Sequence, residues 1–391
     1  MLHQKSLRSM LSSSWKYVLI IVACIGLIYF QAIHFEFVTY DDYELVYQNS
    51  EFLSQITNAL TSFTTHAFTT HRSESAYYRP ILLMSFIADY KIWQLNPLGY
   101  HLTNLLLHCL TAIGVLMLAE KILRDKLLAL LASLLFALHP IQTESVAWVS
   151  GRNDVLLGLF VVAMVVSYIH YNEEPKNRKR YLFLTWLSYL LAIFTKESGV
   201  FYILLLPLYD LCMRRISLRT FLSRDYALNL VVPIIFFVFY LLLRWNAIGE
   251  MIGADKLYGQ VPISERIIQI PGLFTKYLSL LLLPRHLSVV HPADQLIWVN
   301  FPFNMLAFSI TLFIIGGIVI SWRKNPLVCF SLLWLGVGLL PALNIFPLAV
   351  QILEHRLYVP SVGFVLIITF GVNNLLTKIH WMNGYRYALV A

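Results

Sequence analysis

Long apolar runs are the feature that most limits how this chain can fold. Ten of them lie at 17–33, 102–120, 127–139, 154–171, 181–195, 200–213, 227–245, 304–321, 326–343 and 359–377. Charged residues make up only 13% of the chain, whereas soluble domains have roughly 25%. Runs of this kind are typical of helices in lipid, where each backbone polar group is satisfied within its own segment. The sequence therefore predicts an all-α polytopic membrane protein with about 10–11 transmembrane helices.

The distribution of basic residues predicts the topology. With the N-terminus inside, eighteen of the 29 Lys and Arg residues fall in short cytoplasmic segments, as positive-inside sorting requires. The net charge of +8 therefore reflects topology, and we expect no nucleic-acid partner. Pro271 and Lys276 interrupt a further run at 265–284, which we expect to be re-entrant or interfacial. Counting it as a span would place Arg323 and Lys324 outside.

Four local features qualify this picture. No small-residue cleavage site follows the first run, which favours an uncleaved span over a signal peptide. The run at 127–139 would cover only about 20 Å of a core of about 30 Å, so either basic residues snorkel at its inner end or the helix continues into 140–150. Residues 385–391 resemble the start of a further span. The four cysteines lie in or beside apolar runs and indicate no disulfide framework.

The unusual polar residues gather in the predicted outer segments. The first, at about 34–100, contains the adjacent carboxylates Asp41 and Asp42, which could act as a base, bind a divalent metal or be solvated. His101, Asn104 and His108 follow at i, i+3 and i+7 on one helical face. Such a stripe either lines a wet cavity or binds neighbouring helices, and His101, nearest the surface, is the most open to function.

The stretch from His139 to Asp154 is the most informative outer motif. Pro140 can begin a short helix, on which Glu144, Trp148 and Arg152 would present one acid–aromatic–base face. A surface row of ion pairs would look the same.

Two further motifs place basic residues at membrane depth. Lys196 and Glu197 close the fifth span, and Glu354, His355 and Arg356 precede the last. Fixed Lys and Arg side chains suit a phosphate whose tail lies in the bilayer. Interfacial snorkelling is the alternative for each residue taken singly.

Together these motifs resemble one family, the transmembrane and tetratricopeptide-repeat O-mannosyltransferases and their prokaryotic relatives. The resemblance rests on Tyr40-Asp41-Asp42, Tyr78-Arg79-Pro80, Tyr100-His101 with Asn104 and His108, the block 136–154, Thr195-Lys196-Glu197 and 354–364. It implies one GT-C-type glycosyltransferase module over 1–391, with a long first outer loop and a lumenal or periplasmic active face. The family's repeat domain does not follow within the chain.

The resemblance also implies the chemistry. We expect an inverting transfer of a sugar, such as mannose, from a polyprenyl-phosphate donor to an acceptor hydroxyl on a protein or glycan. Asp41 or Asp42 would be the base, and a divalent ion on this pair is the only cofactor considered. The expected phosphate-binding residues are Lys196, Arg356, Arg79 and Arg152. The expected sugar- or acceptor-orienting residues are His101, His139, Glu144, Glu197, Glu354 and Tyr358.

Two other function classes remain open from the sequence. A transporter or flippase of a lipid-linked sugar should show inverted repeats and polar residues at the midplane. A non-catalytic membrane scaffold would not need this set of charged motifs on one face. The expected location is the inner membrane of a prokaryote, facing the periplasm, or the endoplasmic reticulum membrane of a eukaryote.

Overall fold

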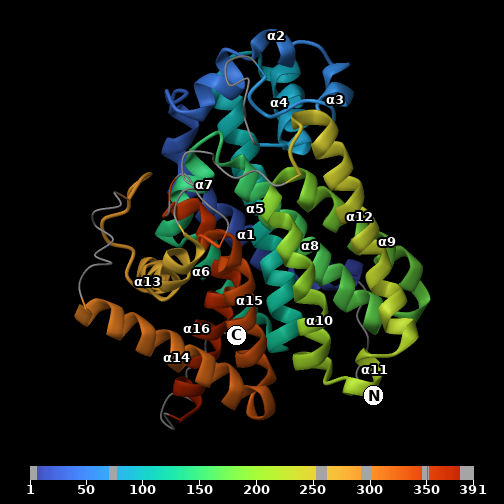
Figure 1. The fold of residues 1–391 in the computed structure, drawn as a ribbon, viewed down its shortest axis with the longest axis vertical. Coiled ribbons are helices and arrows are strands. Elements are labelled where there is room, and N and C mark those ends of the chain that lie inside the picture. Colours follow the sequence, from blue (N-terminus) through green and yellow to red (C-terminus); the bar gives the residue numbers. More distant parts are fainter. Residues whose placement is uncertain are drawn as a thin grey trace.

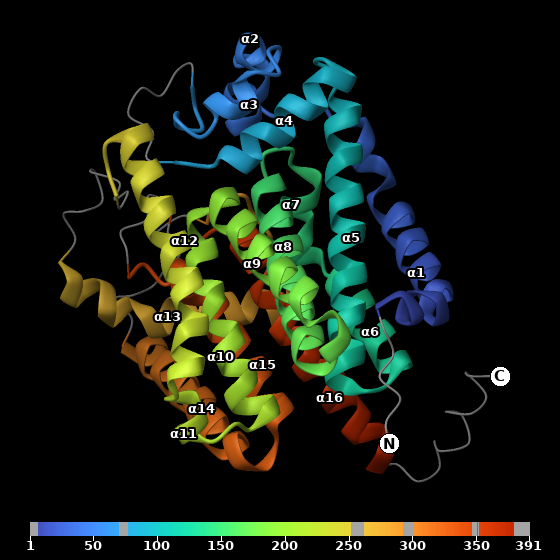
Figure 2. The same cartoon turned by 90° about the vertical axis from the view of Figure 1, so that its right-hand side faces the viewer.

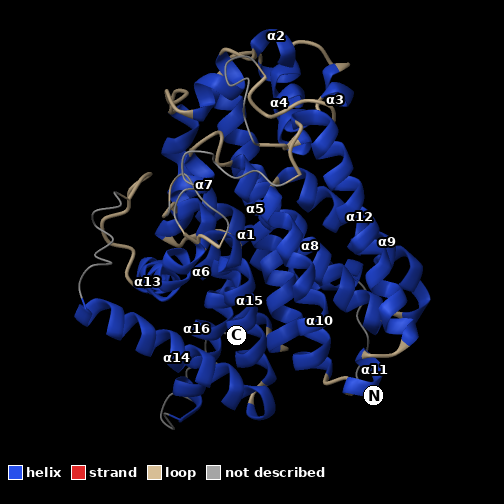
Figure 3. Cartoon of the chain, viewed as in Figure 1, coloured by secondary structure: helices blue, strands red, loops and turns tan. Residues whose placement is uncertain are grey.

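The computed structural model describes residues 7–69, 77–251, 262–291, 301–345, 350 and 352–378. Within these ranges every regular element is helical (Figure 3). The α-helices are α1 (Leu7–Tyr29), α2 (Ser50–Leu53), α3 (Asn58–Thr61), α4 (Pro80–Trp93), α5 (Pro97–Leu123), α6 (Lys126–Ala137), α7 (Thr143–Ala147), α8 (Arg152–Glu173), α9 (Arg178–Thr195), α10 (Leu205–Tyr209), α11 (Leu218–Phe221), α12 (Arg224–Ile248), α13 (Ile263–Leu282), α14 (Phe301–Lys324), α15 (Pro326–Leu339) and α16 (Pro360–Lys378). The predicted all-α class is confirmed.

Local sequence signals explain where several helices begin. Proline opens α4, α5, α15 and α16, where its missing N–H has no helical partner to lose. The side chains of Asn96, Asp125, Ser223 and Asn325 accept backbone hydrogen bonds from the first turns of α5, α6, α12 and α15. These caps satisfy amide groups that would otherwise be stranded at a helix end.

Helix α8 forms the centre of the bundle. Its candidate span is 72% buried inside the protein, whereas that of α14 is 11% buried. It packs against α5 and α9, and α5 also packs against α6. The outer surface of α14 is therefore available to lipid, while α8 is shielded by its neighbours.

All ten predicted apolar runs coincide with helical segments. Among the described residues, six helical segments are long and apolar enough to cross a membrane, from α1 continuing to His34 and from α5, α8, α12, α14 and α16. A bent pair, Lys126–Ala137 with Pro140–Ala147, would make a seventh. The remaining predicted runs form shorter or more polar helices, including α9 and α15.

The two predicted runs with irregular features, 127–139 and 265–284, do not form straight single spans. The 127–139 run ends in α6, bends by 50° and continues in helical form to Ala147, as one of the two expected solutions required. The 265–284 run forms α13, which is not among the six spans and crosses beside the bundle (Figure 2). The predicted further span at 385–391 lies outside the described residues.

The first outer segment is folded rather than extended. Helices α2, α3 and α4 gather at one end of the molecule, and α11 lies at the other (Figures 1 and 2). A hydrophobic cluster at this end, which we call the outer hydrophobic cluster, includes Leu45 and Val46 from the turn Tyr43–Tyr47, Phe86 from α4 and Tyr100 from α5. Burial of these side chains holds the outer segment against the end of the bundle.

Candidate functional site

Residues 139–154 link several outer elements. The segment comprises the helical turn Pro140–Gln142, α7, a turn at 148–151 and the start of α8. Gly151 sits so close to the preceding turn that a Cβ would lie 2.7 Å from the carbonyl oxygen of Ser145. Because Trp148 has an extended backbone, the helix stops there and Arg152 starts a new one. The predicted single face of Glu144, Trp148 and Arg152 is therefore wrong.

Glu144 fixes the segment before α16. Its carboxylate accepts a hydrogen bond from the backbone N–H of His355 at 2.7 Å and contacts the Nδ1 atom of His355 at 2.8 Å. Burial lowers the pKa of His355 to about 3 and raises the pKa of Glu144 to about 7. Glu144 therefore binds His355 in the segment before α16.

Asp42 fixes the first outer segment to the same block. The Asp42 Oδ1 atom accepts hydrogen bonds from the Ser150 N–H at 2.8 Å and the Ser150 hydroxyl at 2.5 Å. Its Oδ2 atom accepts from the Val38 N–H at 3.3 Å. Asp42 is 1% exposed, whereas its neighbour Asp41 is partly exposed. Burial, partly opposed by the Ser150 hydrogen bonds, raises the pKa of Asp42 to about 6.

Arg152 lies in a buried cluster of polar groups beneath the outer surface. Its guanidinium is completely buried, and the Nη2 atom is 2.5 Å from Asp89 Oδ2. Its Nε donates to Asn104 at 2.7 Å, and Nη2 donates to the Tyr100 carbonyl at 3.0 Å. With its charge paired and these donors engaged within the protein, Arg152 has a structural role, and its expected part in binding a donor phosphate stays a prediction.

Four basic side chains gather where α4, α8, α9 and α12 approach the segment before α16. Lys196 Nζ is 2.7 Å from both carboxylate oxygens of Asp154. Glu197 Oε2 accepts from Arg79 Nε at 3.1 Å, and its Oε1 lies 3.6 Å from Arg244 Nη1. The Arg79 guanidinium also lies over the Tyr77 ring, 4.4 Å from its centroid.

The positive charge of Arg356 acts on both Lys196 and Glu144. We define the basic cluster as Arg79, Lys196, Arg244 and Arg356. Burial lowers the pKa of the Lys196 ammonium. Nearby Asp154 opposes this shift, while the positive charges of Arg79 and Arg356 reinforce it. Burial raises the pKa of Glu197, but its cationic neighbours Arg79 and Arg244 outweigh that effect, and the net pKa is lowered. Glu197 is therefore held ionised between two guanidinium groups.

The remaining predicted residues contact protein partners. Glu354 accepts a hydrogen bond from the Ser288 N–H and contacts His291 at 2.8 Å, while His139 contacts the Leu281 carbonyl at 2.9 Å. Tyr358 contacts His108 at 2.7 Å inside the bundle. His108 and Asn104 bind neighbouring elements, as the packing alternative required.

His101 differs from its prediction. It was expected near the surface, yet it is 1% exposed and packs edge-on against Phe35, with ring centroids 6.3 Å apart. The end of α5 is covered by the folded first outer segment, which the sequence pattern did not reveal. This burial removes the reason for singling out His101 as a surface group.

Three residues in these contacts were not among the site residues predicted from the sequence. Asp154 binds Lys196, Arg244 lies beside Glu197, and His291 binds Glu354. Arg244 carried a usable signal, because a charged side chain within an apolar run is costly and tends to face a partner. Asp154 sits at the edge of such a run and carried the same signal.

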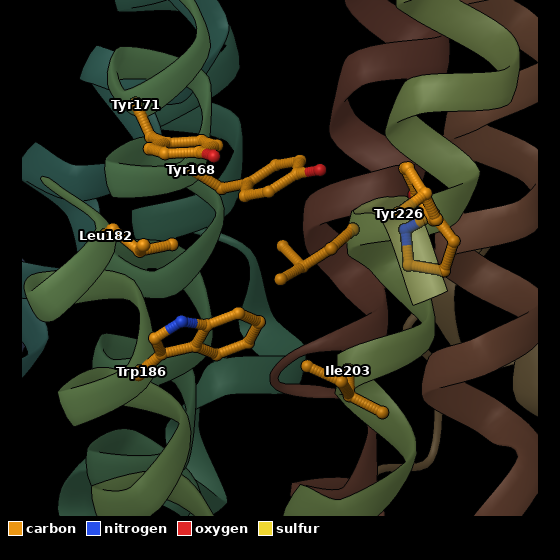
Figure 4. Close-up of a pocket in the computed structure, with 8 residues that line it drawn as sticks. Tyr168, Tyr171, Leu182, Trp186, Ile203 and Tyr226 are labelled. Atoms are coloured by element: carbon orange, nitrogen blue, oxygen red, sulfur yellow. The ribbon is translucent and has the colours of Figure 1, made fainter. Parts of the chain in front are cut away.

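A small aromatic pocket lies at the opposite end of α8 and α9. Tyr168, Tyr171, Leu182, Trp186 and Tyr226 contribute to its walls (Figure 4). Since α8 runs from Arg152 at one end to Tyr171 near the other, this pocket is remote from the basic cluster.

The described residues contain no group of three His, Cys, Asp or Glu side chains placed to hold a metal ion. The divalent ion considered for Asp41 and Asp42 therefore stays a prediction, without a third side-chain ligand of these types in the described part of the chain.

Comparison with known sequences gives homology over most of the chain. Protein O-mannosyl-transferase TMTC3 of Homo sapiens is 25% identical over 400 residues, which cover 93% of this chain and 43% of that protein. Human protein O-mannosyl-transferase TMTC2 is 26% identical over 79% of this chain and 47% of its own length. The Drosophila melanogaster Tmtc1 protein reaches 36% identity over 134 residues, 34% of this chain and 15% of that protein. The chain thus spans less than half the length of these curated relatives. No protein-family model matches it.

Comparison of structures identifies a shared fold. The crystal structure of the apo Archaeoglobus fulgidus oligosaccharyltransferase matches with a TM-score of 0.53 and 13% sequence identity. The match covers 96% of this chain and 53% of the archaeal protein. The expected GT-C-type fold is confirmed, as is the predicted relationship to the O-mannosyltransferases.

Proposed function

We propose that this protein transfers a sugar from a polyprenyl-phosphate donor to an acceptor hydroxyl on the non-cytoplasmic face of a membrane. Mannose is the proposed sugar, because the matched relatives are named protein O-mannosyl-transferases. The proposed membrane is the prokaryotic inner membrane or that of the endoplasmic reticulum. The acceptor is a protein or a glycan.

The observation that carries this proposal is the link between an acidic loop and a basic cluster. Ser150 donates a hydrogen bond to Asp42, and Asp154, four residues further along the chain, forms an ion pair with Lys196. One short segment thereby contacts both Asp42 of the first outer segment and Lys196 of the basic cluster. Glycosyl transfer from a lipid phosphate needs both a base and fixed positive charge for the leaving group.

The proposed reaction is a single displacement. The acceptor oxygen forms a bond to the anomeric carbon while its proton passes to a carboxylate. The bond between that carbon and the phosphate oxygen breaks, and its electron pair leaves with the lipid phosphate, which departs as a dianion. Attack opposite the leaving group inverts the anomeric configuration.

We assign the base to Asp41 and a positioning role to Asp42. Both oxygens of Asp42 accept hydrogen bonds within the protein, and the side chain is buried. Asp41 precedes it on the same turn and is partly exposed, so an acceptor can reach it. Asp42 would keep that turn in place.

We assign the donor phosphate to Arg79, Lys196 and Arg356. Arg79 is anchored through Nε, which leaves an edge of two terminal nitrogens suited to paired bonds with phosphate oxygens. Glu197 would orient that guanidinium, and Glu144 would orient the segment that carries Arg356 through its bonds to His355.

The test uses purified protein in liposomes with radiolabelled polyprenyl-phosphate mannose and a pool of peptide and glycan acceptors. We expect label transfer by the wild type, and loss of transfer in Asp41→Asn with the protein still folded. Transfer that survives in Asp41→Asn would refute the base assignment. If the wild type moves the donor across the bilayer but never transfers the sugar, a transporter replaces the enzyme proposal.

A further inference from the structure

A stacked pair of tyrosines lies exposed on the first outer segment. The rings of Tyr43 and Tyr47 lie 4.9 Å apart at 13°, and the two side chains are 39% and 48% exposed. Tyr40, one turn earlier, is 62% exposed. We call Tyr40, Tyr43 and Tyr47 the tyrosine platform. Tyrosines are effective contact residues because a large rigid ring loses little conformational entropy on binding.

The tyrosine platform is held rigidly. On the other side of the same turn, Leu45 and Val46 are buried in the outer hydrophobic cluster. Asp42, immediately before the turn, is fixed by Ser150. The rings are therefore presented in one arrangement, and a ligand would not have to order them.

The charge around the tyrosine platform favours a cationic ligand. Residues 35–51 contain five carboxylates and no Lys, Arg or His, although the whole chain carries a net charge of +8. Aromatic faces attract ammonium and guanidinium groups, and nearby carboxylates add to this attraction. Segments that lie on anionic membrane surfaces instead carry Lys and Arg. The composition therefore favours a basic polypeptide over lipid as the occupant.

The position of the tyrosine platform relates it to the proposed chemistry. Tyr40 and Tyr43 flank Asp41 and Asp42 in the chain, and the Tyr43 N–H donates to the Tyr40 carbonyl at 3.3 Å. We propose that the tyrosine platform is an acceptor subsite, which binds a Lys or Arg side chain of a polypeptide close to the hydroxyl residue that receives the sugar. This inference rests on the proposed function and adds the class of acceptor.

The first experiment measures binding without donor, so that it does not depend on sugar transfer. The protein is placed in nanodiscs of neutral lipid, and two fluorescent Ser/Thr peptides are compared by anisotropy, one flanked by Lys and Arg and the other by Glu. We expect the basic peptide to bind at least tenfold more tightly. Equal affinities, or equal binding of the basic peptide to empty nanodiscs, would overturn the inference.

Variants test whether the rings carry the binding. An exposed cation–ring contact corresponds to roughly a two- to fivefold change in affinity, so Tyr43→Ala with Tyr47→Ala should weaken basic-peptide binding by about tenfold. Tyr43→Phe with Tyr47→Phe keeps both rings and should bind within about twofold of the wild type. Leu60→Ala, at an 80% exposed position on α3, is the matched surface control and should change nothing. Unchanged binding in the alanine pair would exclude the tyrosine platform.

Transfer assays then separate the two proposals. With an active donor, the alanine pair should raise KM for the basic acceptor by about tenfold and leave kcat unchanged. Peptide binding without any transfer would contradict the proposed function and leave the tyrosine platform as a peptide site. Transfer with no preference for basic acceptors would refute the subsite and leave the enzyme intact.

Discussion

Replacing Asp42 with alanine tests whether this carboxylate is structural. The change would leave the Ser150 and Val38 N–H groups without their acceptor beneath the first outer segment. A buried donor that loses its partner costs roughly 1–3 kcal/mol. The Ser150 hydroxyl can rotate to another acceptor, and Val38 is 43% exposed, so its amide can bond to water. The stranded Ser150 amide alone gives about 1–3 kcal/mol of destabilisation.

The matched change is Asp41→Ala on the neighbouring residue. Because Asp41 is partly exposed, its loss should alter stability by about 1 kcal/mol or less. Loss of a general base should reduce transfer by roughly 10²- to 10⁴-fold. Both variants are compared in detergent by apparent Tm, by the rate of protease cleavage within the first outer segment, and by label transfer.

The expected pattern is a lowered Tm and faster cleavage in Asp42→Ala, and inactivity with wild-type Tm in Asp41→Ala. The reverse pattern, in which Asp42→Ala melts like the wild type but transfers no sugar, would refute the structural role of Asp42. That result would make Asp42 the base and Asp41 the dispensable neighbour.

Three further predictions follow from the buried charges. Arg152→Ala leaves Asp89 buried without its cation, so it should destabilise the protein by roughly 3–5 kcal/mol and lower the yield of folded protein. The fraction of this variant that folds should keep the wild-type KM for the donor. Glu197→Gln removes the charge that orients Arg79, and should raise the donor KM several-fold in initial-rate assays while acceptor KM stays constant. Because the pKa of Asp42 is raised from 3.8 to about 6, the stability contributed by its bound proton is present below pH 3.8 and lost as pH rises through about 6. Apparent Tm should therefore fall between about pH 4 and 6 by more in the wild type than in Asp42→Asn, and parallel curves would contradict this account.

The sequence was sufficient for the fold class and for the importance of residues 139–154. Apolar runs are long enough to identify helices without tertiary information, and every predicted run is helical. The block was recognisable because polar residues are rarely dense at the end of a membrane helix. The contacts of Ser150 with Asp42 and of Asp154 with Lys196 became visible only in three dimensions.

The partners of individual charges could not be predicted. Arg152 binds Asp89, 63 residues earlier, and helical periodicity carries no information about such a distant contact. The break at Trp148 also changed which side chains share a face, because one extended residue resets the helical register. Burial of His101 depended on a fold of the preceding segment that its own spacing does not encode.

The block 139–154 also constrains how this chain can vary in length. Within eleven residues, Glu144, Ser150, Arg152 and Asp154 reach partners on four separate parts of the chain. A substitution affects one of these attachments, but an insertion or deletion displaces every attachment beyond it, since each helical residue advances the chain by about 1.5 Å and turns it by about 100°. Among homologous proteins, gaps should therefore accumulate in the other outer segments, while the number of residues between Glu144 and Asp154 stays fixed.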